Sequence, residues 1–196
     1  MIINSVNSLI QPDVEKCLEV LKQGGIILYP TDTVWGLGCD ATNAQAVEKL
    51  YRLKQRPREK SMVVLLADER DFLKYVTQLD LQVFDYLKAT RKPTTVIYQG
   101  VIGIAENVIN TDGSAAIRLV QDIFCKQLIK RFRKPVVSTS ANISGRPTPA
   151  LFSEIDDVIR NGVDYVAKYR QDESEPATPS SLVRWSENGS VEVVRP

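Results

Sequence analysis

The sequence predicts an α/β fold: a single domain built on a twisted, open, mixed β-sheet with flanking helices and a C-terminal β-hairpin. Short apolar runs typical of buried strands alternate along the chain with segments whose apolar residues recur at helical spacing. Near the end, Asn188 and Gly189 separate two runs of alternating residues, a pattern typical of an antiparallel hairpin, which makes the expected sheet mixed. A length of 196 residues, 43% of them hydrophobic, suits one domain over residues 1–196.

The expected helices share an apolar stripe at three- and four-residue spacing. They cover residues 11–25, 43–55, 69–76, 81–90, 121–132 and 153–162. Pro12 and Asp13 lie near the expected start of the first helix, and Gly24 marks its exit. Pro57 stops the second helix, and Ser153 is the expected N-cap of the last one.

The expected strands are short and apolar. They cover residues 26–30, 61–68, 94–100, 114–120, 134–141 and 164–169, followed by the hairpin over residues 181–196. Residues 31–42 hold two Gly and several Thr and Asp, which predicts a loop or turn. Residues 170–181 are polar and contain Pro, so we expect an exposed, mobile linker that acts as a lid.

Composition excludes several kinds of chemistry. The chain has no His, which removes Ser-His-Asp and Cys-His catalysis and the common zinc patterns. Its three Cys are odd in number and widely spaced, so we expect free thiols in a reducing cytoplasm. A net charge of +1 argues against a broad nucleic-acid-binding face. Neither a secretory signal nor a membrane span is expected, which predicts a cytoplasmic protein.

The first polar motif, "PTDTVWGLGCDA", follows the first expected strand. Thr31 and Thr33 carry hydroxyls, and Gly36 and Gly38 allow a ligand to approach the backbone closely. The alternative is a turn in which the Thr side chains cap the backbone locally. The chain has neither GxxxxGK[ST] nor GxGxxG, so any nucleotide must be held in another way.

The second motif, "YRLKQRPREKSM", concentrates five cations in a nearly neutral chain. The negative end of a helix dipole accounts for Arg52 and Lys54 but not for Arg56, Arg58 and Lys60, which lie at or beyond its end. Arg presents a bidentate fork to phosphate or carboxylate, and Lys presents a point charge. An anionic ligand would relieve the repulsion among these cations.

The third motif, "VVSTSANISGRPTP", ends a buried strand with small hydroxyl and amide side chains, among them Ser138, Ser140 and Asn142. The alternative is an ordinary Ser/Asn-rich turn. Each motif follows a different element, and parallel strands would bring all three to one edge of the sheet.

Together, in this order and spacing, the three motifs resemble the YrdC-like family, the threonylcarbamoyl-AMP synthases, in its short single-domain form. The resemblance implies condensation of L-threonine, bicarbonate or CO2, and ATP into threonylcarbamoyl-adenylate and pyrophosphate. A partner transferase would then modify an adenosine of tRNAs that read codons beginning with A. It also implies Mg2+ bound through the ATP phosphates, with no metal ligand from the protein.

The resemblance also assigns residues. It implies a catalytic set of Lys54, Arg56, Ser140 and Asn142. It implies threonine contacts from Thr33, Arg118, Ser140 and Ser180. It implies nucleotide contacts from Arg56, Lys60, Ser114, Asn142 and Arg195.

Some motifs depart from the family pattern. "TRKPTTV" lacks a Gly-Pro turn, "RLVQD" lacks a His, "SSLVR" has Arg184 where an acid is usual, and Trp35 replaces a common Tyr. These changes concern the fine contacts to ATP. Two alternatives stay open: a double-stranded-RNA-binding module that uses residues 52–60, and a divergent paralogue with another small-molecule substrate. Weak RNA binding as an accessory property is a further expectation.

Overall fold

The computed structural model describes residues 2–60, 62–186 and 189–196. Its strands are β1 (Ile27–Tyr29), β2 (Gly36–Asp40), β3 (Val63–Leu66), β4 (Thr94–Tyr98), β5 (Ala115–Leu119), β6 (Val136–Ser140), β7 (Tyr165–Val166), β8 (Ser181–Trp185) and β9 (Val191–Arg195). Its helices are α1 (Ile2–Lys22), α2 (Ala44–Lys54), α3 (Glu69–Tyr75), α4 (Gln82–Ala89), α5 (Ile123–Phe132) and α6 (Asp157–Asn161), with 3-10 turns η1 (Glu106–Val108) and η2 (Phe152–Glu154).

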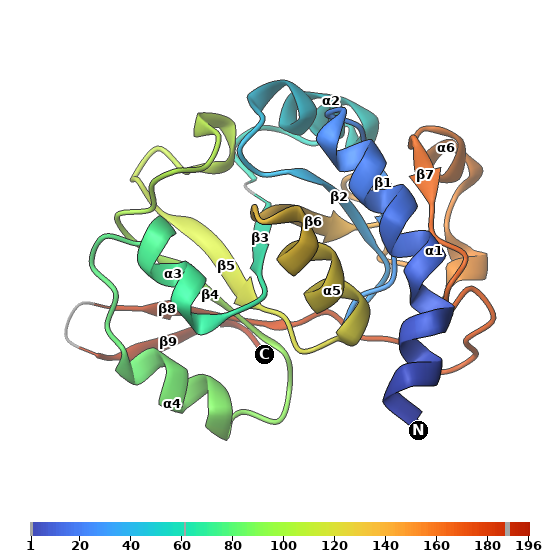
Figure 1. Ribbon diagram of the computed structural model, residues 1–196. Helices are drawn as coiled ribbons and strands as arrows, with labels where there is room; N and C mark the ends of the chain where they lie inside the picture. Colours follow the sequence, from blue (N-terminus) through green and yellow to red (C-terminus); the bar gives the residue numbers. More distant parts are fainter. Residues whose placement is uncertain (1, 61, 187–188) are drawn as a thin grey trace.

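All of these strands belong to one sheet, in the order β7-β1-β2-β6-β3-β5-β4-β8-β9 (Figure 1). Three neighbouring pairs are parallel: β1 with β7, β3 with β5, and β4 with β8. The other neighbouring pairs are antiparallel, including the terminal β8–β9 hairpin. The structure therefore confirms the predicted α/β class with a mixed sheet and a C-terminal hairpin.

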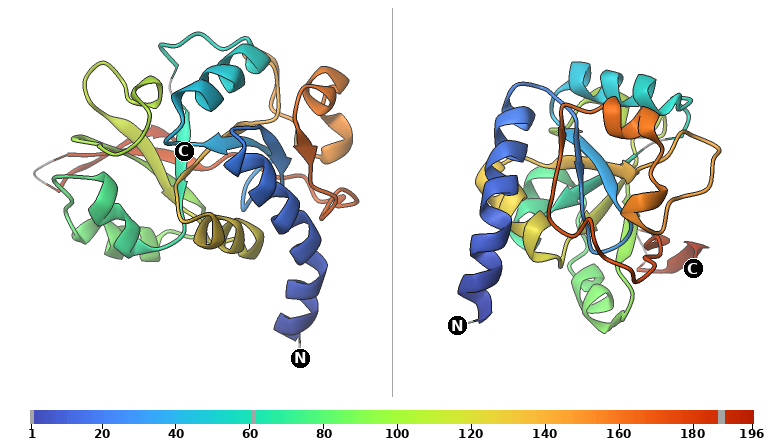
Figure 2. Two further views of the ribbon diagram at one scale, coloured as in Figure 1. Left: turned by 45° about the horizontal axis from the view of Figure 1, so that its top comes forward. Right: turned by 90° about the vertical axis from the view of Figure 1, so that its right-hand side faces the viewer.

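Helices cover the sheet and bury its apolar side chains. Figure 1 shows α1 and α5 beside each other on one face, with α3 on the same face. In the right-hand view of Figure 2, α1 and α6 lie on opposite sides of the β1–β2 end of the sheet. The central strands β3 and β6 carry fully buried residues such as Leu65, Val136 and Val137, which is why their sequences read as continuous apolar runs.

The prediction of a loop over residues 31–42 is wrong for its second half, which is strand β2. All five residues of β2 are buried between β1 and β6. A Cβ at Gly38 would lie 2.7 Å from the Tyr29 ring and 3.0 Å from the Val137 carbonyl oxygen. The glycine that indicated a turn therefore permits close packing within the sheet.

The first helix begins earlier than predicted. Pro12 lies inside α1 and not near its start, although its nitrogen has no hydrogen to donate to the preceding turn. Ile10 and Val14, on either side of it, are each only 1% exposed. Burial of this apolar face outweighs the local cost of the proline, as tertiary packing commonly does.

The segment before the last strands is less regular than expected. Asp156, and not Ser153, caps α6, because its side chain accepts a hydrogen bond from the Val158 backbone N–H. The strand predicted over residues 164–169 is only the two residues of β7. In the terminal hairpin, Gly189 has a φ of 77°, while Asn188 lies outside the described residues.

Two further expectations concern the whole chain. No helix in the described part has both the length and the apolar character needed to cross a bilayer. Cys17, Cys39 and Cys125 are buried free thiols, as their spacing predicted.

Candidate active site

The three polar motifs meet around one cavity of about 190 Å³. Antiparallel pairing of β2 with β6 places Gly36 opposite Ser140, and the Trp35 carbonyl accepts a 3.1 Å hydrogen bond from Ala141 N–H. The Lys54 carbonyl accepts one of 2.8 Å from Ser144 N–H. The cavity is lined by Thr33, Val34, Trp35, Gly36, Arg56, Met62, Val63, Arg118, Ser138, Thr139, Ser140, Thr148, Pro179, Ser180 and Arg195.

The end of helix α2 directs Arg56 into this cavity. Asn43 starts the helix by accepting hydrogen bonds from the backbone N–H groups of Gln45 and Ala46. Gln55 ends it in the left-handed conformation, with a φ of 49°. The chain therefore turns sharply after Lys54, so that Arg56 lines the cavity.

Lys54 supports the cavity wall from behind. Its side chain is 1% exposed, and Nζ donates to the backbone carbonyls of Ser140 and Asn142, the latter at 2.7 Å. Burial, with a smaller effect from the Arg56 charge, lowers the pKa of Lys54 from 10.5 to about 7. Lys54 is absent from the cavity lining and instead fixes the backbone after β6.

This lowered pKa predicts how stability changes with pH. Between about pH 7 and 10.5 the unfolded chain binds a proton at Lys54 that the folded chain has released. The free energy of unfolding then rises with pH, by up to about 1.4 kcal/mol per pH unit for one group. The free energy of unfolding of the wild type minus that of Lys54→Met should increase from pH 7 to 9 and change little below pH 6. Urea titrations of both proteins measure it, and a difference that stays constant over this range contradicts the predicted shift.

Two hydroxyls line the cavity, one from the first motif and one from the third. Thr33 is held by Thr31, whose Oγ1 accepts the Thr33 N–H at 3.0 Å, lies 3.0 Å from Thr33 Oγ1 and donates to the Val34 carbonyl at 2.8 Å. Ser140 Oγ donates to Asn142 Oδ1. These contacts fix both hydroxyls on short, ordered segments facing the same space.

Arg118 projects from β5 and is 5% exposed. Its Nη2 lies 3.1 Å from Asp32 Oδ1, while its buried Nε has no hydrogen-bond partner among the described residues. Asp32 Oδ2 also accepts a hydrogen bond from Gln121 N–H. Arg118 thus brings a guanidinium to the cavity wall while one of its arms is paired with Asp32.

The C-terminal segments close the cavity on another side. Ser180 is 3% exposed, and its Oγ lies 2.9 Å from Thr95 Oγ1. Arg195 donates from Nε and Nη2 to the Ser180 carbonyl, at 3.2 and 2.9 Å. Arg195 thereby ties strand β9 to the end of the 170–181 segment, and both residues line the cavity.

Besides Lys54, three of the predicted site residues lie outside the cavity lining. The Asn142 amide donates to the carbonyls of Ile143 and Arg146, within its own loop. Lys60 is exposed and accepts a hydrogen bond from Arg56 Nε at its carbonyl. Ser114 Oγ donates to Asp112 Oδ1 at 2.6 Å, in the turn before β5. Their assigned contacts with substrate stay predictions.

The remaining cations of the second motif face away from the cavity. Arg52 Nε lies 3.1 Å from Glu48 and Arg58 Nη2 lies 2.6 Å from the same carboxylate. Both arginines are largely exposed, so these pairs add little to stability. The cationic segment is therefore divided: Arg56 faces the cavity, and its arginine neighbours are paired on the surface.

Sequence reasoning overlooked Asp32 and Thr148. Asp32 stands between Thr31 and Thr33 in the first motif, and only the fold reveals that its partner is Arg118 on β5. Thr148 lies in the third motif, but no feature of its own distinguished it from neighbouring polar residues. Among the described residues, no three His, Cys, Asp or Glu side chains gather into a group that could hold a metal ion.

The site is a polar cavity in an α/β protein, with three arginines and no acidic side chain among its described lining residues, which is a lining suited to small anions. The Sua5/YciO/YrdC family model, described as "Telomere recombination", matches residues 19–196, and the chain belongs to this family. This confirms the resemblance carried by the three motifs.

Curated relatives cover most of the chain. Threonylcarbamoyl-AMP synthase of Vibrio campbellii is 33% identical over 171 residues, covering 86% of this chain and 91% of the relative. The protein of the same name from Pseudoalteromonas translucida is 31% identical over 184 residues, covering 92% of this chain and 97% of the relative.

Solved structures share the fold. P. abyssi Sua5 complexed with L-threonine superposes with a TM-score of 0.81 at 19% identity, covering 93% of this chain and 53% of that one. E. coli YciO superposes with a TM-score of 0.80 at 23% identity, covering 94% of this chain and 89% of that one. At these identities the likeness concerns the fold.

Proposed function

We propose that this protein is a threonylcarbamoyl-AMP synthase, an enzyme of the nucleotidyltransferase type. Relatives with that name match almost the full chain at 31–33% identity. The observation that carries the proposal is the convergence of Arg56, Arg118 and Arg195 with the hydroxyls of Thr33 and Ser140 on one cavity. All three motifs that carry the family resemblance contribute to it.

The reaction joins L-threonine, bicarbonate or CO2, and ATP. The threonine amine is carboxylated to a carbamate, with release of a proton when CO2 is the reactant or of water when bicarbonate is. A carbamate oxygen then attacks the α-phosphorus of ATP. The bond from that phosphorus to the bridging oxygen breaks, and pyrophosphate leaves with its electron pair. No nucleophilic side chain is required, which suits a chain without His.

The protein's task is to gather anions, align them and keep water from a carbamate that decomposes in it. Arg118, which lines the cavity, presents its guanidinium to the threonine carboxylate. Thr33 and Ser140 orient threonine and the carbamate, while Arg56 and Arg195 meet the phosphates. Lys54 holds the Ser140 backbone in place by hydrogen bonds to the carbonyls of Ser140 and Asn142.

Further parts of the proposal concern the surroundings of the site. Mg2+ would arrive with ATP, held by the phosphates, which needs no cluster of protein carboxylates. Residues 170–181 would serve as a lid, supported by the positions of Pro179 and Ser180 in the cavity wall. A tRNA threonylcarbamoyl transferase would consume the product in the cytoplasm. The assigned roles of Lys60, Ser114 and Asn142 belong to this proposal as well.

The test is pyrophosphate release from ATP by the purified protein with Mg2+ and bicarbonate. We expect release that requires L-threonine, and much less with L-serine, because the cavity must recognise the added methyl group. Release with another amino acid in place of threonine would instead identify a paralogue with a different substrate. Absence of release, accompanied by salt-sensitive binding of double-stranded RNA, would contradict the proposal in favour of the RNA-binding alternative.

A further inference from the structure

The chain that leads to the 170–181 segment is fixed to the body of the protein. Asp13 of α1, which is 4% exposed, accepts hydrogen bonds from the Tyr165 hydroxyl and from the backbone N–H groups of Lys168 and Tyr169. The Tyr169 ring stacks on Phe124 of α5, with centroids 6.0 Å apart and planes 9° apart. The position of the next residue, Arg170, is therefore set from outside the cavity.

Arg170 adopts a backbone conformation that is unfavourable for its residue type. Its φ is 68°, in the left-handed region that side chains other than Gly, Asn and Asp rarely occupy. The other described residues of this kind, Gln55 and Arg133, are C-caps of α2 and α5, where this conformation is common. Arg170 caps no helix, so the conformational free energy lost in this left-handed backbone must be offset by contacts of its side chain.

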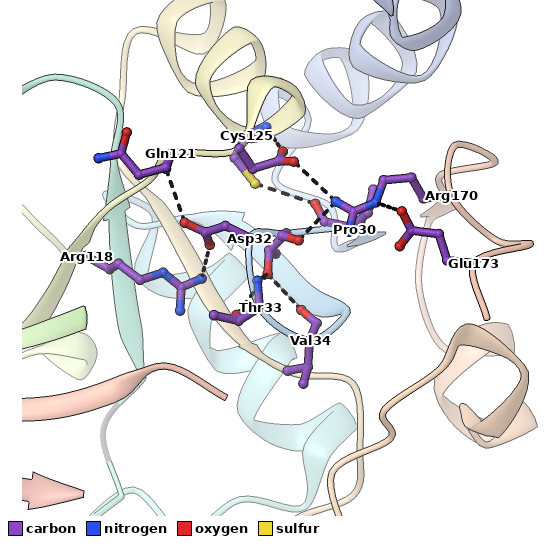
Figure 3. A network of polar contacts seen from close by, with 11 residues as sticks. Pro30, Asp32, Thr33, Val34, Arg118, Gln121, Cys125, Arg170 and Glu173 are labelled. Atoms are coloured by element: carbon purple, nitrogen blue, oxygen red, sulfur yellow. Dashed lines mark hydrogen bonds and ion pairs between the residues drawn. The ribbon is translucent and has the colours of Figure 1, made fainter. Parts of the chain in front are cut away.

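The guanidinium of Arg170 reaches the loop between β1 and β2. Its Nη1 lies 3.1 Å from the Thr31 carbonyl oxygen and 3.2 Å from Asp122 Oδ2, and its Nε donates to Glu173 (Figure 3). Asp122 is the N-cap of α5 and also accepts a hydrogen bond from Cys125 N–H. A single side chain thus links the 170–181 segment, helix α5 and the first motif.

The same loop is held on its other side by Arg118. Asp32 pairs with Arg118 and accepts the Gln121 N–H, and Gln121 precedes Asp122 in the chain (Figure 3). Two ion pairs, Arg118–Asp32 and Arg170–Asp122, therefore flank the loop. Both are anchored just before α5, by the backbone of Gln121 and by the side chain of Asp122. The position of Thr33 depends on this arrangement. The Thr31 carbonyl accepts a hydrogen bond from Arg170, and the Thr31 hydroxyl contacts the Thr33 backbone N–H and hydroxyl.

We propose that Arg170 is a positioning residue for the threonine subsite: through the Thr31 carbonyl and Asp122 it presets the loop that carries Asp32 and Thr33. This inference rests on the proposed function for its substrate. Arg170 is absent from the lining of the central cavity and acts through the loop. A loop ordered before threonine arrives loses less conformational freedom on binding, so Arg170 improves threonine binding more than the chemical step.

The experiment compares Arg170→Gln and Arg170→Lys with the matched control Arg131→Gln. Arg131 also bridges two elements, with Nη1 3.1 Å from Gln11 and Nη2 3.7 Å from Glu15, on the outer surface of α1 and α5. We expect Arg170→Gln to raise the KM for threonine about 10-fold, the effect of losing one charge-assisted hydrogen bond. The KM for ATP and kcat should change little, and Arg170→Lys should recover part of the loss. Equal effects on both substrates, or effects matched by Arg131→Gln, would overturn the proposal.

A second readout is independent of turnover. The chain has two Trp, and Trp35 lies at the end of the loop in question, 5% exposed and packed on Phe152. In a Trp185→Phe background, Trp35 emission without substrate reports the state of the loop. A shift to longer wavelength in Arg170→Gln but not in Arg131→Gln supports the proposal, and identical spectra refute it. A wild type that lacks threonine-dependent turnover would contradict the proposed function and leave this measurement valid.

Discussion

Arg56→Ala is expected to lower threonine-dependent pyrophosphate release by orders of magnitude while the protein stays folded. Arg56 lines the cavity beyond the end of α2, and the cap of that helix is made by the backbone of Gln55, which the substitution leaves in place. A positioned cation that meets the charge developing on a phosphate acts in the transition state, so kcat should fall. Loss of one such donor typically costs about 10²–10³-fold in kcat. Pyrophosphate release at saturating ATP and threonine measures the loss, and thermal unfolding verifies the fold.

Arg58→Ala provides the matched control for this experiment. Arg58 belongs to the same cationic segment but pairs with Glu48 on the surface, at 2.6 Å. Its removal should leave turnover near the wild-type level. If both substitutions reduced turnover equally, the effect would come from the net charge of the segment and not from the geometry of the cavity. Turnover of Arg56→Ala at the wild-type level would exclude the role assigned to Arg56.

The fold could be predicted wherever a periodic apolar pattern also determined local structure. Helix α2 is an example, since its apolar stripe, its Asn43 cap and its end before Pro57 agree with one another. Strand β2 could not be predicted in this way, because two of its five residues are Gly. It is a strand because it pairs with β1 on one side and with β6 on the other. These two partners are distant from each other in the sequence.

The gathering of the three motifs was predicted correctly, although the expected reason was partly wrong. Parallel strands were expected to bring them to one edge, whereas β2 and β6 are antiparallel and meet through the register of Gly36 with Ser140. Register depends on side-chain packing across the sheet, which a single sequence does not reveal.

The contacts of Arg170 mark the limit of local sequence reasoning. Its partners Thr31 and Asp122 are 139 and 48 residues away along the chain. Nothing within the polar segment around Arg170 distinguishes it from an exposed linker residue. Only the fold gives it a position beside the first motif, and only its backbone conformation indicates that this position is specified.

Arg118→Lys is expected to raise the KM for threonine by about 10- to 100-fold, the equivalent of losing one hydrogen bond to a charged group. In the wild type one arm of Arg118 is paired with Asp32, and the guanidinium also lines the cavity in which the substrate carboxylate would bind. Lysine preserves the charge that Asp32 requires, so the fold should survive. Its single ammonium group cannot serve two carboxylates in the planar geometry of a guanidinium.

Initial rates with threonine and ATP varied separately measure this effect, and calorimetric titration of threonine measures it without turnover. Arg184→Lys is the matched control, because Arg184 lies on β8 outside the cavity lining and its Nε is 3.9 Å from Glu192. The two substrates distinguish the possible roles of Arg118. A rise confined to threonine identifies Arg118 as the carboxylate contact, since ATP carries no carboxylate. An equal rise for ATP would mean that Arg118 serves the phosphates, and the threonine carboxylate would then have to be met by another cation of the cavity, Arg56 or Arg195.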